Sequence, residues 1–389
     1  MKRVLLALGG LLVLVAILFF ALMPGILERG MNQVQSGPEP EVTDAARALH
    51  QTLVVGDLHT DSTLWHRDLS ERAERGHVDI PRLVDGNVAV QVFTSVTKSP
   101  AGQNYEQNAT DTRDNITLLA MVQRWPMRTW DSLAERAIYQ AEKVHRLAEE
   151  HPGQLQLVRN RQELSALLVR RAEGETVVGA VLGTEGSHAL DGDLANIDRL
   201  YDNGLRIMGL QHCFDNKLGG SLHGESGAGL SDFGRQAVAR MLAKGMIIDV
   251  AHSSEQVVLD VLAMTDKPLI VSHTGFKGHC DTPRNISDQT MQAIAAEGGL
   301  IGVGYWDAAV CETSVAAIVD AVRYGIDLVG VDHVALGSDY DGTITAPFDT
   351  SQLLLLTSEM LARGFTETEI RKVMGLNLVR LLERELPED

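Results

Sequence analysis

The residues with the clearest chemical potential are histidines and carboxylates that follow short apolar runs. His59 and Asp61 are separated by one residue in Asp-Leu-His-Thr-Asp. Side chains two residues apart on a β-strand point to the same face, so these two can bind one metal ion together. His252 and His273 end two consecutive apolar runs. If those runs are neighbouring strands of a barrel, their imidazoles can converge on a second metal position.

Glu185, in Gly-Thr-Glu-Gly, can supply a carboxylate between two such ions. Paired metal ions about 3.5–4 Å apart are clamped by groups that they share. Histidine and carboxylate ligands suit zinc better than magnesium or calcium, while manganese and iron stay open as alternatives. We therefore expect two Zn²⁺ ions per chain, bridged by Glu185. The three cysteines (Cys213, Cys280 and Cys311) form no C-x-x-C pair, which leaves one disulfide and one free thiol as an option.

Two further carboxylates follow the last apolar run. Asp339 has no metal role assigned to it, which fits a general acid or base that takes a proton from the attacking water and passes it on. Asp341 lies two residues later, and we expect it to bind a loop or the substrate; the simpler alternative is a turn residue before Gly342. For any single histidine, a buried side chain bonded to the backbone is the simpler interpretation. Six of the eight apolar runs end in a histidine or carboxylate, which favours one shared site.

These runs have the character of buried parallel strands. They are nearly continuous in apolar residues and alternate with longer amphipathic stretches, which predicts an α/β fold with eight units, a (β/α)₈ TIM-type barrel. An open doubly wound sheet is the alternative, weakened because no G-x-G-x-x-G follows the first run. The eight runs are Leu53–Gly56, Ala89–Phe93, Val177–Leu182, Arg206–Leu210, Met246–Val250, Pro268–Val271, Gly299–Gly304 and Val334–Gly337.

The stretches between the runs have helical periodicity. A closing stretch, Thr366–Leu386, is expected to form one or two helices with a break at residues 375–377. The other main helical patterns are Leu118–Glu149, Leu194–Asn203, Ser231–Lys244, Ser254–Met264, Ser287–Glu297, Ser314–Tyr324 and Thr350–Arg363.

The start of the chain differs from the rest. Lys2 and Arg3 precede an uncharged apolar run, Val4–Leu27, which is interrupted by Pro24. The run exceeds the roughly 20 residues that span a bilayer, and it is longer than the apolar region of a typical secretory signal. We therefore expect a transmembrane helix that stays uncleaved, with a cleaved signal and a secreted body as the alternative. Basic residues before the helix place the body outside the cytoplasm, in the periplasm or at the cell exterior.

This organisation predicts three parts. Residues 1–30 form the anchor or signal segment, 31–45 a linker, and 46–389 the barrel domain. The chain has 34 basic and 52 acidic residues, a formal net charge of −18. Such a charge argues against binding nucleic acid, or anionic lipid, through a basic surface.

Six motifs in order resemble those of the membrane dipeptidases (renal dipeptidase type) of the amidohydrolase superfamily. The resemblance extends from about Leu53 to the end of the chain, and the order of the motifs makes it more specific than any one of them. The motifs are Asp-Leu-His-Thr-Asp, Gly-Thr-Glu-Gly, Ile-Asp-Val-Ala-His-Ser-Ser, Val-Ser-His-Thr-Gly, Pro-Arg-Asn-Ile-Ser-Asp and Gly-Ser-Asp-Tyr-Asp-Gly.

The resemblance implies a binuclear zinc barrel that hydrolyses dipeptides. It makes His59 and Asp61 ligands of one zinc, Glu185 the bridge, and His252 and His273 ligands of the other. It also implies that His212 polarises the scissile carbonyl, that Arg284 holds the substrate's carboxylate and that Asp339 is the catalytic acid and base. A hydroxide bridging the two metals would attack the peptide carbonyl. Family members often form homodimers, so the resemblance implies a homodimer as well.

Two other functions remain alternatives to the dipeptidase. One is an amidohydrolase acting on another small amide such as an N-acyl amino acid, because a fold and its metals do not fix the substrate. The other is a non-catalytic receptor on the same barrel, which predicts the loss of a ligand or of the acid and base. None of these residues is missing, so the receptor is the less favoured alternative.

Overall fold

The computed structural model describes residues 2–35 and 37–388, and its centre is a closed ring of eight parallel strands. In ring order the strands are β3, β2, β10, β9, β8, β7, β6 and β5, and β5 pairs back with β3. This ring confirms the predicted (β/α)₈ barrel. The strands are β2 (Val55–Thr60), β3 (Val88–Phe93), β5 (Val178–Thr184), β6 (Leu205–Gly209), β7 (Ile247–Asp249), β8 (Ile270–Thr274), β9 (Leu300–Val303) and β10 (Val334–Leu336).

Helices surround this ring. Four of them begin directly after Ser231, Ser254, Ser287 and Ser314, and each of these serine hydroxyls accepts a backbone N–H of the first turn. Helix starts at these serines were therefore predictable from the sequence. The helices after the N-terminal one are α2 (Asp44–Gln51), α3 (Ile80–Asp85), α4 (Asn115–Val122), α5 (Arg128–Asp131), α6 (Leu133–Glu150), α7 (Arg161–Ala172), α8 (Ala195–Asp202), α9 (Asp232–Ala243), α10 (Glu255–Leu262), α11 (Asp288–Ala296), α12 (Asp307–Val310), α13 (Val315–Val329), α14 (Leu354–Ala362), α15 (Glu367–Arg371) and α16 (Asn377–Glu385).

The helical pattern at Leu118–Glu149 is divided into α4, α5 and α6 rather than forming one helix. Arg124 adopts a positive φ of 59°, and Pro126 follows two residues later. Both features oppose a continuing helix, since proline disfavours helical geometry in the residue before it. Ser132 then caps α6 by accepting from Glu135 N. A short strand that the sequence did not indicate, β4 (Leu155–Leu157), pairs with the first half of β5.

α16 packs against the amino-terminal ends of the barrel strands. Leu378 and Leu382 belong to the same buried cluster as inward-facing side chains such as Ile207 and Ile247. The chain reaches this position through a kink at Gly375, where a Cβ would lie 2.0 Å from Val54 O, so only glycine fits. The expected break at residues 375–377 is therefore present. Because this end of the ring is filled, a site must form at the carboxyl ends of the strands.

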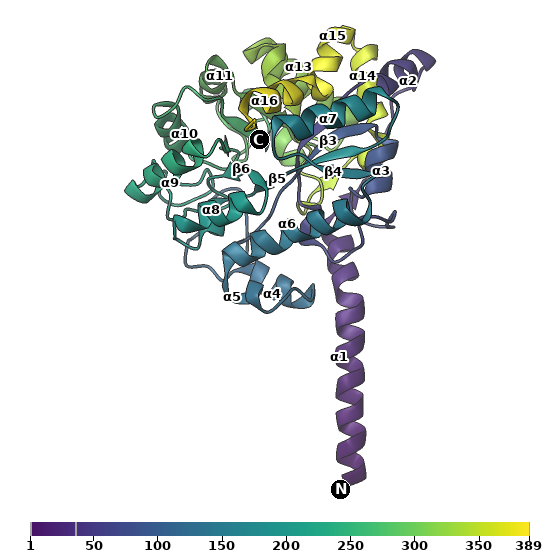
Figure 1. Ribbon diagram of the computed structural model, residues 1–389, viewed down its shortest axis with the longest axis vertical. Helices are drawn as coiled ribbons and strands as arrows, with labels where there is room; N and C mark the ends of the chain where they lie inside the picture. Colours follow the sequence, from purple (N-terminus) through teal and green to yellow (C-terminus); the bar gives the residue numbers. More distant parts are fainter. Residues whose placement is uncertain (1, 36, 389) are drawn as a thin grey trace.

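The N-terminal helix, α1 (Lys2–Met31), projects from the body at the end that carries α4, α5 and α6 (Figure 1). Among the residues that the structure describes, it is the one helix long and apolar enough to cross a membrane. It continues through Pro24, as transmembrane helices often do. Within the segment expected as a linker, β1 (Gln33–Val34) pairs with β11 (Thr345–Ala346).

Candidate metal centre and active site

The residues predicted for the site gather around one cavity at the carboxyl ends of the strands. The cavity has a volume of about 560 Å³ and is partly open to solvent. His59, in β2, lies directly beside the cavity residue Asp61, since their side chains are 3.5 Å apart. The predicted residues that line the cavity are Asp61, Glu185, His212, His252, His273, Arg284 and Asp339.

Glu185 lies at the centre of this cluster. It follows β5 directly, and its Oε1 atom is 3.0 Å from His252 Nε2 and 3.4 Å from His273 Nε2. The same oxygen is 3.8 Å from His59 Nε2. Its other oxygen, Oε2, is 3.3 Å from His212 Nε2. Three histidines therefore face one oxygen of the carboxylate, and a fourth faces the other.

Three groups of side chains have ligand atoms close enough to share a metal ion. One contains His59, Asp61 and Glu185, as the sequence predicted. Another contains Glu185 and His252 with His212, so His212 lies within reach of the second position. The third group joins His59 and His273 with Asp339. Glu185 takes part in two of the three, which is the arrangement that a bridging carboxylate needs.

The charges in the cluster favour a bound cation. Asp61, Glu185 and Asp339 are all buried. Burial lowers the pKa of His59, but these three carboxylates outweigh it and raise that pKa to about 10. Burial and the nearby Arg284 hold the pKa of His252 well below its usual value. The His252 Nε2 atom, 3.0 Å from His273 Nε2, can therefore offer a lone pair to a metal ion. Together, the histidines and carboxylates of the cluster fit divalent metal ions that prefer nitrogen and oxygen ligands.

A hydrogen-bonded pair that the sequence did not reveal orients two of these histidines. Ser272 Oγ donates to Asp249 Oδ2 at 2.6 Å and lies 2.8 Å from His273 Nδ1. It also lies 3.3 Å from His59 Nδ1. Such contacts fix the ring orientation of a metal-binding histidine. Asp249 ends β7, three residues before His252, and Ser272 lies in β8, one residue before His273. That spacing, together with the adjacency of the two strands, was the available signal in the sequence.

Asp57 connects β2 with Ser338, the second residue after β10, through hydrogen bonds to its carboxylate. Its carboxylate accepts His59 N at 2.9 Å and Ser338 N at 3.1 Å. It precedes His59 by two residues on the same strand face. This contact holds the strand that carries His59 against the loop that carries Asp339.

Asp339 and Asp341 occupy different environments. Burial raises the pKa of Asp339 well above its usual value, and its Oδ1 lies 3.9 Å from His59 Nε2. Asp341 is not part of the cavity lining: its carboxylate accepts Ser62 Oγ and His77 N, both at 2.7 Å, and pairs with Arg67. Of the two roles expected for Asp341, these contacts are those of a residue that binds loops.

The loop after β10 carries backbone strain. Asp339, Asp341 and Thr343 have positive φ angles of 59°, 64° and 68°. Residues other than glycine rarely adopt this region, and such strain gathers at functional sites. The strained backbone directs Asp339 into the cavity and Asp341 away from it.

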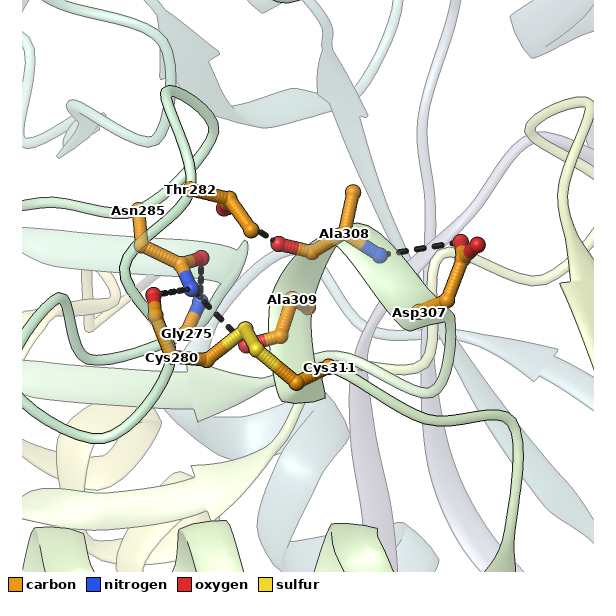
Figure 2. Close-up of a disulfide and its surroundings, with 8 residues drawn as sticks. All are labelled: Gly275, Cys280, Thr282, Asn285, Asp307, Ala308, Ala309 and Cys311. Carbon is orange, nitrogen blue, oxygen red and sulfur yellow. Dashed lines mark hydrogen bonds between the residues drawn. A yellow bond between two sulfur atoms is a disulfide. The ribbon is translucent and has the colours of Figure 1, made fainter.

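Arg284 lies in the loop after β8 and is fully buried. Its Nη2 donates to His273 O at 2.7 Å, its Nη1 donates to Thr274 Oγ1 at 3.0 Å, and its guanidinium lies 5.3 Å from the Trp306 ring centroid. A disulfide between Cys280 and Cys311 fixes the loop to α12 (Figure 2).

The residue after Arg284 adds to this attachment. Asn285 Nδ2 donates to Cys280 O at 2.8 Å and to Ala309 O at 2.9 Å (Figure 2). The third cysteine, Cys213, is free and buried beside the cavity.

The sequence profile of the membrane dipeptidase family (Peptidase family M19) matches residues 43–387. The chain belongs to this family. A relative from Klebsiella pneumoniae, described as an uncharacterized protein in the pqqA 5′ region, is 31% identical over 236 residues, which are 57% of this chain and 87% of the relative. The resemblance seen in the motifs is confirmed, and the chain is a hydrolase of a metallopeptidase family.

Several solved structures share the barrel of this membrane dipeptidase family member. The probable dipeptidase PvdM from Pseudomonas aeruginosa has a TM-score of 0.71 at 19% identity, covering 89% of this chain and 98% of that protein. An amidohydrolase from Pseudomonas aeruginosa has a TM-score of 0.68 at 21% identity, with coverages of 88% and 99%. A metallo peptidase from Rhodobacter sphaeroides, liganded with a phosphinate mimic of the dipeptide L-Ala-D-Ala, has a TM-score of 0.66 at 23% identity, with coverages of 86% and 99%.

This dipeptidase family member also brings a loop residue to the cavity that the sequence left without a role. Tyr105, from the segment between β3 and α4, lines the cavity, and its hydroxyl accepts Trp306 Nε1 at 3.1 Å. Its carbonyl lies 2.9 Å from His223 Nδ1, and the His223 ring is 5.5 Å from that of His252. His223 therefore packs behind the cluster.

Proposed function

We propose that this protein is a binuclear zinc dipeptidase that cleaves the peptide bond of dipeptides. The observation that carries the proposal is the position of Glu185, which belongs to two groups of side chains close enough to share a metal ion, one with His59 and Asp61 and one with His212 and His252. His59 and Asp61 would hold one ion, His252 and His273 the other, and Glu185 both. When bound, the two zinc ions supply Lewis acidity and lower the pKa of a coordinated water.

Arg284 would bind the carboxylate at the end of the substrate. Its guanidinium is held by backbone carbonyls and Trp306, so its position is set before the substrate arrives. A planar fork of donors matches a carboxylate. This contact also sets the length of the substrate, because a longer peptide has no carboxylate at that distance from the metal ligands.

His212 would hydrogen-bond to the scissile carbonyl. Its Nδ1 lies 3.0 Å from Lys98 O and must donate to it, because a carbonyl only accepts. Burial lowers the pKa of His212, but Cys213 and Glu185 outweigh it and raise the pKa well above its usual value. A raised pKa favours a proton on Nε2 as well, and that proton would be the one donated to the carbonyl.

Asp339 would move the proton. Burial raises the pKa of its carboxyl, so the group can both accept a proton from water and release it to the leaving amine. It lies on the cavity wall, with its Oδ1 3.9 Å from His59 Nε2.

We also propose that residues 1–30 anchor the protein, with 31–45 joining them to a catalytic domain, 46–389, outside the cytoplasm. The apolar length of α1 supports the anchor. The disulfide between Cys280 and Cys311 supports an oxidising compartment.

The proposal is tested by metal analysis and turnover of the full chain in lipid nanodiscs. We expect about two zinc ions per chain and chelator-sensitive release of amino acids from dipeptides. Tripeptides with the same first two residues should be poor substrates. Cleavage of N-acetyl amino acids in preference to dipeptides would establish the sibling amidohydrolase instead, and a metal-free, inactive protein would contradict both.

A further inference from the structure

The last turns of α1 form part of the cavity wall. Leu27 and Met31 line the cavity that contains the metal-binding cluster. Facing them are apolar side chains from α4 and from the loops after β2 and β3, and together they make an apolar chamber. The other members of this apolar chamber are Leu64, Val96, Ile116, Leu118, Leu119 and Val122.

The end of α1 is fixed firmly to the barrel. Glu28 is fully buried, and its carboxylate oxygens lie 2.6 Å from Arg67 Nε and 2.6 Å from Arg75 Nε. Asn32 Oδ1 accepts Thr343 N at 2.8 Å, next to the strained loop that carries Asp339. The contacts with the two arginines offset the cost of burying the Glu28 carboxylate and attach the end of α1 to the barrel. The wall is therefore a built feature of the site.

This part of the wall lies before the segment that the family profile matches. The family profile begins at residue 43, whereas Leu27 and Met31 precede it. The apolar chamber is thus completed by residues outside the matched segment, so membership of the family does not by itself fix which side chains the apolar chamber accepts.

The apolar chamber lies across the barrel from Arg284. In the ring of eight strands, β7 is opposite β2 and β8 is opposite β3. Arg284 follows β8 and contacts Ala251 and His273 at the ends of β7 and β8. The apolar chamber is built from the loops after β2 and β3, with α1 and α4. A dipeptide whose carboxylate lies at Arg284 therefore extends its first residue toward the apolar chamber.

We propose that the apolar chamber binds the side chain of the first residue and makes the enzyme selective for dipeptides that begin with a large apolar residue. The inference rests on the proposed function, because it needs Arg284 to hold the carboxylate. Burial of an aliphatic side chain against Leu27, Met31 and Leu119 supplies the selectivity.

The test compares Leu-Gly with Gly-Gly, which share the second residue and the carboxylate. The full chain is assayed in lipid nanodiscs so that detergent does not fill the apolar chamber. We expect the kcat/KM ratio of Leu-Gly to Gly-Gly to exceed 10, and Met31→Ser to lower it about tenfold, as pocket changes of this size do. Leu119→Ser, on the facing wall, should lower it similarly and guards against a folding defect at α1.

Ile26→Ser is the matched control. Ile26 lies one residue before Leu27 on α1, is 58% exposed and does not line the cavity, so the ratio should be unchanged. A ratio near one in the parent chain, or one that neither wall variant alters, would overturn the inference while leaving the dipeptidase intact. Failure of the parent chain to cleave either dipeptide would overturn the proposed function and the inference with it.

Discussion

Glu185 is the residue whose contacts best support the proposal that the cluster binds metal. Its carboxylate is buried among four histidines, and burial alone would raise its pKa. The positive potential of His212, His59 and His273 outweighs this and holds the pKa of Glu185 below its usual value. A permanently ionised carboxylate among imidazoles is suited to divalent cations.

Asp339→Asn should keep the metals and lose most turnover. The amide has nearly the same shape but cannot carry the proton, so kcat should fall about 10²- to 10⁴-fold. Metal content by plasma mass spectrometry and kcat on a cleaved dipeptide measure the two effects. Normal turnover would remove Asp339 from the mechanism.

His59→Ala should lose metal as well as rate. His59 belongs to two of the groups that can share an ion. Its removal leaves the metal position beside Asp61 with only the carboxylates of Asp61 and Glu185 and no imidazole ligand. His50→Ala is the control: that histidine is also buried, but it contacts Thr357 and Gly86 outside the cavity. Full metal occupancy in His59→Ala, equal to that of the control, would contradict the assignment.

The residues that gather at the cavity were predictable because each stands near the end of an apolar run, where strand periodicity dictates the direction of the side chain. The partners that orient them were not. Ser272 contacts Asp249 and His59, which are 23 and 213 residues away in the chain. Such contacts depend on which strands become neighbours. Asp341 shows the converse: its spacing from Asp339 suggested the same face, but the positive φ angles of both residues break strand periodicity.

At the scale of elements, parallel strands and serine-capped helices were recognisable, whereas segments without periodicity were not. Runs buried on both faces identify β2 through β10 with the exception of β4, in which only Leu155 is fully buried. β1 and β11 have two residues each, and β1 begins two residues after the end of α1. Short pairings of this kind leave no pattern in the sequence.

The loop that carries Arg284 should depend on its disulfide. Closing a loop between cysteines separated by 31 residues stabilises the protein by about 3 to 4 kcal/mol through the unfolded chain. Cys280→Ser with Cys311→Ser should therefore lower the free energy of unfolding by roughly that amount, measured by denaturant titration. KM for dipeptides should rise because Arg284 is less well held, whereas Cys213→Ser should leave stability nearly unchanged. An unaltered KM would mean that Asn285 alone fixes the loop.

At the scale of the whole molecule, the eight apolar runs in the sequence predicted a closed barrel. Nothing in the sequence predicted that the N-terminal helix would be attached to that barrel. From the sequence, we predicted a membrane segment, a linker at residues 31–45 and a separate catalytic domain. In the structure, Glu28 and Asn32 contact the same loops that position Asp339 and Asp341. Arg67 joins them, because it pairs with both Glu28 and Asp341.

The point at which the chain is shortened should therefore decide whether its soluble form is stable. A chain starting at Gly25 lacks most of the apolar run but keeps Leu27 and Glu28. A chain starting at Glu41 loses Glu28, the partner of Arg67 and Arg75, and also loses the cavity wall that Leu27 forms opposite α4. We expect the shorter chain to be less stable by about 1 to 3 kcal/mol, measured by denaturant titration in zinc-saturated buffer. Glu28→Gln in the longer chain isolates the ion pairs from the apolar wall. If the two truncated chains unfold at the same denaturant concentration, the end of α1 is only a tether, and the charge network behind Asp339 is complete without it.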